Sequence, residues 1–347
     1  MKIALDATYS VGQNLTGVGV YSRAMLQGLA GSHRDTHFLW CYRPHRFLRA
    51  LSDPMPATCA RRLLTTSWAP RADIFHALNQ RVDVSRSKHT VATFHDLFVI
   101  SGDYSTPEFR ARFTEQARNA AARSDLVITV SAFTARQVEE HLKVDPRRIR
   151  VIHHGAERPL VTTSVSGHEQ LILNVGALQR RKNIVRLVEA FEQTPSDWGL
   201  ALAGSSGFGA EEIVARIEAS PRRQDIQLLG HVSDQTLTGL YHRASIFAFP
   251  SLDEGFGMPL LDAMACGVPI LTSNVSALPE VAGDAALLVD PHHTESIASG
   301  LNQLIADPEL RTQLAARGLA RAKNFTWEKA VEKTWNVYQE LVGSANS

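Results

Sequence analysis

Short runs of apolar residues alternate with segments of helical period along the whole chain. Within each run almost every position is apolar, which is typical of strands buried on both faces of a parallel sheet. The runs predict strands at Ile3–Asp6, Phe38–Tyr42, Ile74–Ala77, Thr90–His95, Leu126–Ser131, Ile149–His153, Leu171–Gly176, Leu200–Gly204, Ile226–Gly230, Ile246–Pro250, Pro269–Ser273 and Ala286–Asp290.

The segments between these runs predict helices. After Ser233, a favourable N-cap, apolar residues recur at positions i, i+3, i+4 and i+7 counted from Leu237. Residues 294–342 predict a mostly helical tail. Strands that alternate with helices in this way indicate the α/β class with a parallel sheet.

A polar stretch at Thr162–Gln170 interrupts the alternation and predicts a linker. At roughly 150 residues per domain, 347 residues leave room for two domains. We therefore expect doubly wound parallel-sheet domains at residues 1–163 and 164–325. Ligands of such sheets bind beyond the carboxyl ends of the strands, and two domains also offer the cleft between them.

Composition excludes several classes of protein. Hydrophobic residues make up 44% and charged residues 20% of the chain, which is typical of a folded globular protein. The first residues form no signal-peptide core and no run of about 18 apolar residues follows, so we expect a cytoplasmic protein. Cys41, Cys59 and Cys266 are widely separated and lack metal-ligand spacing, so we expect ordinary core or surface residues.

Charge is distributed unevenly, although the net charge is only +1. The part before residue 160 holds 22 basic and 14 acidic residues, the rest 14 and 21, so the halves carry +8 and −7. Nucleic acid, a phospholipid surface or a phosphorylated acceptor would fit the basic half, and chance stays open. Nucleic acid is least favoured, because no RNA or DNA fold signature is present. A membrane surface or a polyprenyl-diphosphate acceptor would suit the residues Arg43, Arg46, Phe47, Leu48, Arg49, Arg61, Arg62 and Trp68.

The most informative stretch is Phe249–Pro269, which passes from an apolar strand through a glycine-bearing loop into a helix. Pro259 falls at about the first helical position, where proline costs no hydrogen bond. Free backbone N–H groups and the helix dipole there favour a phosphate, and Gly255 and Gly257 allow its close approach.

Glu254 and Asp262 flank this helix start. Carboxylates of this kind accept hydrogen bonds from sugar hydroxyls. The alternative for both residues is an ordinary structural role, in which an acid near a helix N-terminus complements the helix dipole.

A basic loop follows the strand at Leu171–Gly176. Arg180, Arg181 and Lys182 stand in a row where a helix is expected to begin, and cations there oppose the dipole unless an anion binds. Arginine makes bidentate contacts and lysine provides a point charge, which together suit a diphosphate. A solvated basic turn remains the alternative.

The first half contains weaker signals. Gly17 and Gly19 lie between the first strand and an amphipathic helix, but a glycine pair is neither a Walker loop nor a dinucleotide fingerprint. His95 ends the strand that begins at Thr90, which directs it to the ligand-binding edge of the sheet, although a purely structural histidine is the alternative. No Asp-x-Asp occurs, and neither histidine pair has a matching acid or cysteine pattern, so we expect no bound metal.

Together these residues resemble the retaining GT-B glycosyltransferases of family 4, also called glycosyl transferases group 1. The resemblance covers essentially the whole chain and is strongest at Pro250–Pro269. It implies two Rossmann-like domains that face a cleft, with a nucleotide-sugar donor held mainly by the second domain and an acceptor mainly by the first. It also implies a C-terminal helix, at 326–347, that crosses back to pack on the first domain.

The resemblance implies a role for each candidate residue. Glu254 would contact the donor sugar, with His95 near it, and Arg181 and Lys182 would neutralise the diphosphate; these four are the expected catalytic residues. The expected donor-binding residues are Gly17 and Gly19 near the phosphates, Val232 near the base, Phe256, Gly257 and Met258 through backbone amides, and Asp262 on the ribose.

The sequence departs from the family's pattern at two positions. Asp262 stands where the family usually has Glu, and its side chain is shorter by one C–C bond, about 1.5 Å, so its contact with the ribose would become longer or water-mediated. Ala177 stands where an arginine usually follows the glycine of the basic loop, which leaves Arg181 or Arg180 as the substitute.

These features predict a metal-independent retaining glycosyltransferase without a cofactor. It would move a hexose, best mannose from GDP-mannose, onto a sugar or lipid-linked saccharide acceptor in polysaccharide or glycolipid biosynthesis. No carboxylate is an evident nucleophile. The resemblance implies the front-face reaction usually proposed for this family, in which Arg181 and Lys182 would stabilise the leaving group. The protein would be cytoplasmic or peripheral on the inner face of the plasma membrane. The alternatives are another GT-B enzyme, such as a nucleotide-sugar epimerase or a phosphorylase, and a non-catalytic nucleotide-sugar binding protein.

Overall fold

The computed structural model describes residues 1–12, 15–156 and 169–343. The chain forms two compact units, the first made of residues 1–155 and 325–347 and the second of residues 156–324. The predicted domain boundary between residues 163 and 164 lies outside the described residues. Most of the predicted linker does too, but Glu169 and Gln170, which it included, begin a strand instead.

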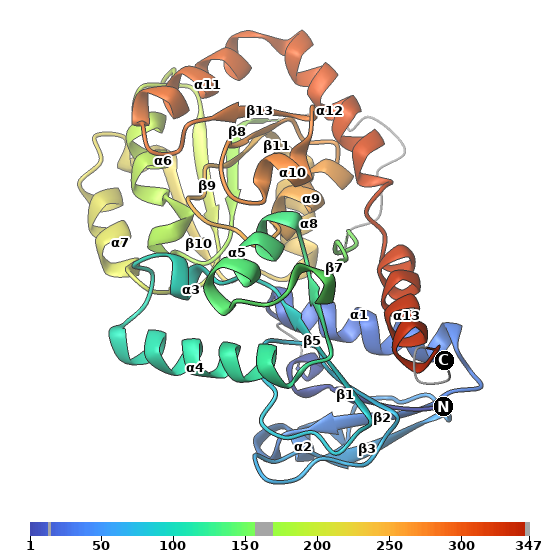
Figure 1. The fold of residues 1–347 in the computed structure, drawn as a ribbon. Helices are drawn as coiled ribbons and strands as arrows, with labels where there is room; N and C mark the ends of the chain where they lie inside the picture. Colours follow the sequence, from blue (N-terminus) through green and yellow to red (C-terminus); the bar gives the residue numbers. More distant parts are fainter. Residues whose placement is uncertain (13–14, 157–168, 344–347) are drawn as a thin grey trace. The chain divides into compact units, whose positions relative to one another are not determined.

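A parallel sheet forms the centre of the first unit (Figure 1). Its strand order, among the described residues, is β3-β2-β1-β4-β5-β6-β7, which is the Rossmann order extended by one strand. The strands are β1 (Lys2–Asp6), β2 (His37–Tyr42), β3 (Cys59–Leu63), β4 (Ile74–Ala77), β5 (His89–Phe94), β6 (Leu126–Thr129) and β7 (Ile149–Val151).

The strand β3 was not predicted. Among the described residues it pairs only with β2, at the edge of the sheet, and its sequence Cys-Ala-Arg-Arg-Leu is progressively more exposed toward its end. An edge strand need not be apolar at every position, so a search for continuous apolar runs misses it.

The first unit's described helices are α1 (Gly17–Ser32), α2 (Pro44–Ala50), α3 (Phe98–Ser101), α4 (Pro107–Arg123), α5 (Ala132–Leu142) and α13 (Trp327–Gly343), with short 3-10 turns at Thr8–Ser10 and Pro146–Arg148. The C-terminal helix α13 lies beside α1 (Figure 1). Gly28 of α1 permits this contact, because a Cβ there would lie 2.4 Å from Val331 Cγ2. Val331 and Tyr338 belong to the same core as Leu5 of β1, so α13 completes the first unit, as the resemblance implied.

A buried chain of hydrogen bonds ties α13 to the sheet. The Tyr21 hydroxyl is 3.0 Å from Thr93 Oγ1, which is 2.8 Å from His76 Nε2, and His76 Nδ1 is 2.6 Å from the Tyr338 hydroxyl. Burial lowers the pKa of His76 to about 3, with a smaller contribution from His95. His76 is therefore neutral and acts as a connector between β4 and α13.

The second unit repeats the Rossmann order with strands β10-β9-β8-β11-β12-β13 among its described residues. These are β8 (Glu169–Val175), β9 (Gly199–Ala203), β10 (Ile226–Gly230), β11 (Ala244–Phe249), β12 (Ile270–Ser273) and β13 (Ala286–Val289). Each corresponds to a predicted apolar run. The described helices are α6 (Ile184–Phe191), α7 (Ala210–Glu218), α8 (Asp234–Arg243), α9 (Met258–Ala265), α10 (Leu278–Ala282), α11 (Thr294–Ala306) and α12 (Pro308–Ala322), with 3-10 turns at Arg180–Lys182 and Arg223–Asp225.

Helices cover both faces of this second sheet. Ile246 and Ala248 of β11 share a core with residues of α6 and α11, whereas the intervening Phe247 packs against Tyr241 of α8, with ring centroids 5.7 Å apart. The predicted N-cap is confirmed, since the Ser233 side chain accepts a hydrogen bond from the Thr236 N–H. A strand covered on both sides must be apolar at successive positions, which explains why these runs were recognisable.

Candidate functional site

The basic loop after β8 depends on glycine. Gly176 has φ +150°, and a Cβ on Gly204 would lie only 1.9 Å from the Gly176 carbonyl oxygen. The loop then forms the 3-10 turn Arg180–Lys182, and α6 begins only at Ile184, after the left-handed Asn183. The three cations therefore precede the helix and do not form its first turn, which corrects the sequence-based expectation.

Two connections hold this loop against the loop that follows β11. The Asn183 side-chain amide donates to the carbonyl oxygens of Pro250 at 3.1 Å and Pro291 at 2.7 Å. The Leu252 N–H donates to the Arg181 carbonyl oxygen at 2.7 Å. Because β8 and β11 are neighbours, these contacts place the basic loop and the Glu254 loop at the same edge of the sheet.

Glu254 lies between two cations. Its Oε1 is 2.5 Å from Lys182 Nζ and its Oε2 is 2.9 Å from Arg181, which also donates to the Asp253 carbonyl oxygen at 2.9 Å. The exposed fractions of the three charged side chains are 14% for Arg181, 7% for Lys182 and 8% for Glu254. The Lys182 ammonium also lies 4.6 Å from the centroid of the Phe249 ring, a favourable cation–π distance.

Two cations keep Glu254 ionised. Burial by itself raises the pKa of Glu254, but the charges of Arg181 and Lys182 outweigh it and hold that pKa at about 2. The carboxylate is therefore charged and contacts both cations. Arg181 and Lys182 are the groups of this cluster that suit a further anion.

Arg181, rather than Arg180, is the arginine of this cluster. Arg180 points to Glu212 at 2.9 Å, lies 5.7 Å from the centroid of the Phe208 ring, and its side chain is 51% exposed. The sequence offered Arg180 and Arg181 as substitutes for the arginine that the family usually has at position 177. Arg181 is the more buried of the two, and Arg180 is exposed.

The N-terminus of α9 lies directly after Glu254. Gly257 is its N-cap in the left-handed region at φ +99°, and a Cβ there would lie 2.8 Å from Leu278 Cδ2. Met258 is the first helical residue, so Pro259 occupies the second position and not the first. Phe256, the third residue expected to offer a backbone amide, is 4% exposed. The N–H groups at such a helix start have no acceptor within the helix, which makes them donors for an anion.

Asp262 is a buried acid within α9, 8% exposed, and α9 has no acid in its first turn. The alternative of a carboxylate that complements the helix dipole from the first turn therefore does not apply to Asp262. Val232 is half-buried between β10 and the Ser233 cap of α8. Both residues lie in the second unit with Glu254.

His95 follows β5 in the first unit and is 6% exposed. Its Nε2 is 3.0 Å from the Leu78 carbonyl oxygen; because a carbonyl only accepts, Nε2 carries the proton and Nδ1 is left as an acceptor. Burial lowers the pKa of His95 to about 4, although the bond to Leu78 opposes this. Its ring packs against Tyr21 and His154, with centroids 4.8 Å and 5.4 Å away.

Sequence reasoning did not single out Tyr21 or His154. The second histidine of the pair at 153–154 was considered only as a metal ligand, whereas in the structure it is a buried ring 3% exposed. Its position just beyond the end of β7 was the available signal, because it places the ring at the same sheet edge as His95.

Gly17 and Gly19 have different surroundings in α1. Gly17 is exposed at the helix start, after the Thr16 N-cap. Gly19 is buried, and a Cβ there would lie 2.8 Å from the Tyr9 carbonyl oxygen. Gly19 is thus required for packing of the helix against the Thr8–Ser10 turn.

The predicted basic surface of the first unit is smaller than expected. Arg43 is only 6% exposed and pairs with Asp83 at 2.5 Å and Asp6 at 3.6 Å, so it is part of the interior. The side chains of Arg46, Phe47 and Arg61 are half-buried. The exposed members are Leu48, Arg49, Arg62 and Trp68, joined by Leu51 and Leu63.

Cys41, Cys59 and Cys266 are buried and are not joined in a disulfide, which confirms their interpretation as ordinary core residues. Among the described residues, no group of three or more His, Cys, Asp or Glu side chains is arranged to hold a metal ion. Within the same residues, none of the helices combines the length and apolar character that a membrane span requires.

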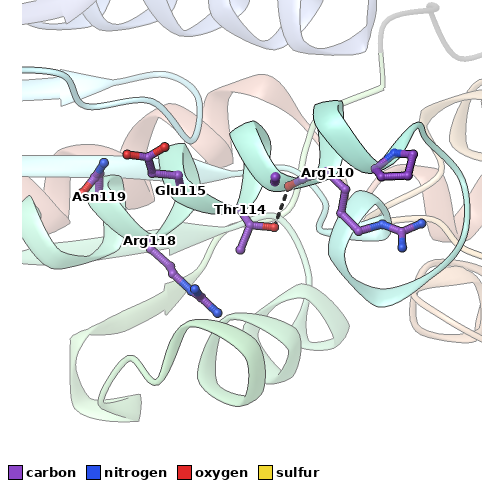
Figure 2. Close-up of a pocket in the computed structure, with 7 residues that line it drawn as sticks. Arg110, Thr114, Glu115, Arg118 and Asn119 are labelled. Carbon is purple, nitrogen blue, oxygen red and sulfur yellow. Dashed lines mark hydrogen bonds between the residues drawn. The ribbon is translucent and has the colours of Figure 1, made fainter.

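A hollow of about 590 Å³ lies along one side of α4. Figure 2 shows residues that line it. Its described lining residues all come from that helix, including Arg110, whose carbonyl oxygen accepts from the Thr114 hydroxyl at 2.7 Å. None of the predicted site residues lies there, so it is separate from the candidate site.

Comparison with known proteins identifies the family. The descriptions "Glycosyltransferase Family 4" and "Glycosyl transferases group 1" match residues 16–158 and 163–321. O-antigen chain mannosyltransferase B of Escherichia coli is 31% identical, with 98% of this chain and 100% of that protein covered. The serotype-specific mannosyltransferase WbdA of Escherichia coli is 28% identical over 74% of this chain, which covers 34% of WbdA. The chain belongs to the glycosyl transferases group 1 family and is a glycosyltransferase.

Solved structures agree on the fold. Sucrose-phosphate synthase from Thermosynechococcus elongatus has a TM-score of 0.79 at 21% identity, with 99% of this chain and 100% of that chain covered. WaaG, a glycosyltransferase involved in lipopolysaccharide biosynthesis, has a TM-score of 0.70 at 16% identity, with 97% and 99% covered. The fold is GT-B, as predicted from the sequence.

Proposed function

We propose that this glycosyltransferase is a retaining, metal-independent mannosyltransferase that takes mannose from GDP-mannose and extends a saccharide acceptor in surface-polysaccharide synthesis. Its full-length similarity to an O-antigen chain mannosyltransferase supports the sugar and the pathway. The observation that carries the proposal is the buried cluster of Arg181, Lys182 and Glu254 beside the N-terminus of α9.

The cluster explains how a donor would bind. Arg181 and Lys182 contact the Glu254 carboxylate, which takes the position that an anionic ligand would otherwise hold beside these cations. A diphosphate competes for the same cations and gains the N–H groups at Gly257 and Met258. As it takes over these contacts, Glu254 becomes available to accept hydrogen bonds from hydroxyls of the donor sugar.

The same groups would act on the leaving group. In the front-face reaction, the bond between the anomeric carbon and the diphosphate oxygen breaks while the acceptor oxygen bonds to that carbon from the same face. The acceptor proton moves to the departing diphosphate oxygen. Arg181 and Lys182 stabilise the charge that develops there.

Binding of the donor is tested by thermal shift with GDP, UDP, ADP and their sugars, with and without chelator. Ligands that bind the folded state raise the melting temperature, so GDP and GDP-mannose are expected to do so equally with chelator present. Arg181→Gln should abolish the shift, while the matched variant Arg180→Gln, at an exposed arginine, should keep it. A shift with UDP alone would exclude GDP-mannose as the donor. A shift that disappears with chelator would show that donor binding requires a metal ion.

Transfer is tested with GDP-mannose and a mannose-terminated oligosaccharide. Coupling constants of the product at its anomeric centre should show the α configuration of the donor retained. A converted sugar formed without acceptor would favour an epimerase, whereas donor binding without turnover would favour a non-catalytic binding protein.

We also propose that the first unit associates with an anionic lipid surface. Leu48 is 78% exposed and Leu51 54% exposed, close in sequence to exposed Arg49, and such a mixture suits a lipid interface. Co-sedimentation with vesicles that contain phosphatidylglycerol should fall when Arg49 and Arg62 are both changed to Ser. Unchanged co-sedimentation would exclude this surface.

A further inference from the structure

The strand order of the first sheet reverses between β1 and β4. From β1 the chain continues through β2 to β3 on one side, and β4 then lies on the other side of β1. In open parallel sheets, ligands bind beyond the carboxyl ends of the strands at such a reversal. The first unit therefore has a binding edge of its own, and the residues that follow β1 and β4 are its candidate ligand contacts.

A buried polar network holds this edge together. Asp6, the last residue of β1, is fully buried and accepts hydrogen bonds from the Thr8 N–H at 3.1 Å and from the Asn79 amide at 3.3 Å. Asn79 follows Leu78, whose carbonyl oxygen is 3.0 Å from His95 Nε2. The loops after β1 and β4 are thus connected to each other and to His95, beyond the end of β5.

Tyr9 faces solvent from this fixed edge. It is the middle residue of the Thr8–Ser10 turn, whose two other residues are buried, whereas Tyr9 is 45% exposed. The Ser10 carbonyl oxygen accepts a hydrogen bond from Arg23 at 3.1 Å. On the α1 side, a Cβ on Gly19 would lie only 2.8 Å from the Tyr9 carbonyl oxygen. The backbone of Tyr9 is therefore held between the buried network and α1, while its side chain stays accessible to a ligand.

Charged groups are connected to the same turn. The Arg43 N–H donates to Thr8 Oγ1 at 3.2 Å, and the Arg43 guanidinium contacts Asp83 at 2.5 Å. Asp83 also pairs with Arg81 at 3.0 Å, and the Asp83 side chain is 20% exposed. Burial raises the pKa of this carboxyl, but hydrogen bonds from Arg81 and Arg43 outweigh burial and lower it. An accessible ring together with an ionised carboxylate favours a ligand that has both an apolar face and hydroxyl groups.

We propose that Tyr9 binds the acceptor, and that its ring packs against a sugar ring of the saccharide that receives the transferred hexose. A sugar ring carries C–H groups on its face, which pack against the π electrons of an aromatic ring, and hydroxyls at its rim, which remain free for polar groups such as Asp83. Tyrosine provides such a contact area at a low cost in side-chain entropy. This inference rests on the proposed function, since it concerns the acceptor of that reaction.

Transfer kinetics of the full-length protein distinguish acceptor binding from a structural role. At saturating GDP-mannose, Tyr9→Ala should raise the KM for a mannose-terminated trisaccharide about tenfold and leave kcat nearly unchanged, because a contact made equally in the ground and transition states affects KM alone. Tyr9→Phe keeps the ring and should behave as the wild type. Phe109→Ala is the matched control, because Phe109 is 43% exposed but lies on α4, outside the loops that follow β1 and β4.

Binding is followed without turnover in full-length protein labelled with 3-fluorotyrosine. The chain has six tyrosines, and the ¹⁹F signal that is missing from Tyr9→Phe belongs to Tyr9. In the presence of GDP, the mannose-terminated trisaccharide should move this signal saturably. Glucose-terminated and galactose-terminated trisaccharides are titrated separately. The thermal shift with GDP-mannose reports on the donor independently, so a failure of the proposed donor is distinguished from a failure of this contact.

Several outcomes decide the proposal. A stationary Tyr9 signal with all three trisaccharides would overturn it, even if transfer itself is observed. A saturable shift with the glucose-terminated or galactose-terminated trisaccharide alone would support the contact and show that the acceptor ends in another sugar. An equal rise in KM for Tyr9→Ala and Phe109→Ala would overturn it, as would a loss of kcat alone. Tyr9→Ala should keep the wild-type melting temperature within a few degrees, because the side chains that hold the turn remain.

Discussion

Replacing Glu254 by Gln should remove much of the acid sensitivity of the second unit. The pKa of this carboxyl is about 2 in the folded chain against an ordinary 4.5. Because the folded pKa is the lower one, the stabilisation is complete above pH 4.5 and is lost as the pH falls toward 2. This difference between the folded and the ordinary pKa, at about 1.4 kcal/mol per pKa unit, corresponds to about 3 kcal/mol of stability. By pH 3 more than half of this stabilisation should be gone, about 2 kcal/mol.

The assay is urea unfolding of the wild type and Glu254→Gln at pH 7 and pH 3, followed through fluorine-labelled Trp198. This is the one tryptophan in the sequence between residues 156 and 324, so it reports on the second unit without assuming that both units unfold together. Other carboxyl groups titrate in both proteins. At each pH the free energy of unfolding of Glu254→Gln is subtracted from that of the wild type. The change in this difference between pH 7 and pH 3 therefore reports on Glu254.

The matched control is Glu169→Gln. Glu169 pairs with Arg243 at 2.7 Å, but its side chain is 50% exposed, so solvent screens the pair and the effect of the substitution should stay below about 1 kcal/mol. For Glu254→Gln, a difference from wild type that is the same at pH 7 and pH 3 would refute the reasoning. It would mean that Arg181 and Lys182 do not stabilise the carboxylate against burial.

Three further substitutions test other parts of the structure by urea unfolding. Arg43→Ala leaves Asp6, which is fully buried, without its cation and should cost about 3–5 kcal/mol; a loss below about 1 kcal/mol would show that Asp6 is otherwise compensated. Tyr338→Phe removes the hydrogen bond to His76 and should cost about 1–3 kcal/mol, and an unchanged midpoint would exclude the chain as a tether of α13. Gly257→Ala forces a Cβ into a left-handed residue and should cost about 1–3 kcal/mol while weakening GDP binding; wild-type stability and affinity together would contradict the role of Gly257 in the α9 N-terminus.

The predicted strands and the missed strand have one explanation. Ile246–Pro250 and the other runs are apolar because helices cover both faces of their sheets, so local composition was sufficient. Within the part of the chain that the structure describes, β3 has a partner strand on one side only, so Arg61 and Arg62 are tolerated at this edge. Position in the sheet, which the local pattern does not contain, decided that case.

The candidate site was predictable residue by residue but not as an arrangement. The loop around Glu254 and the basic loop at Arg181 and Lys182 could each be identified from strand ends, glycines and charge. That Lys182 contacts Glu254, 72 residues away, follows from the adjacency of β8 and β11. Likewise, the exclusion of Arg43 from the surface follows from its contacts with Asp6 and Asp83.

The sequence by itself determined the α/β class, the succession of strands and helices, and the loops that carry polar groups, because each depends on residues close together in the chain. Only the tertiary structure decided which of these groups meet, which are buried, and therefore which are charged. Strand order brings distant loops to one sheet edge, and burial removes the water that would otherwise screen their charges. For this reason the pKa of Glu254 and the tautomer of His95 are properties of the fold.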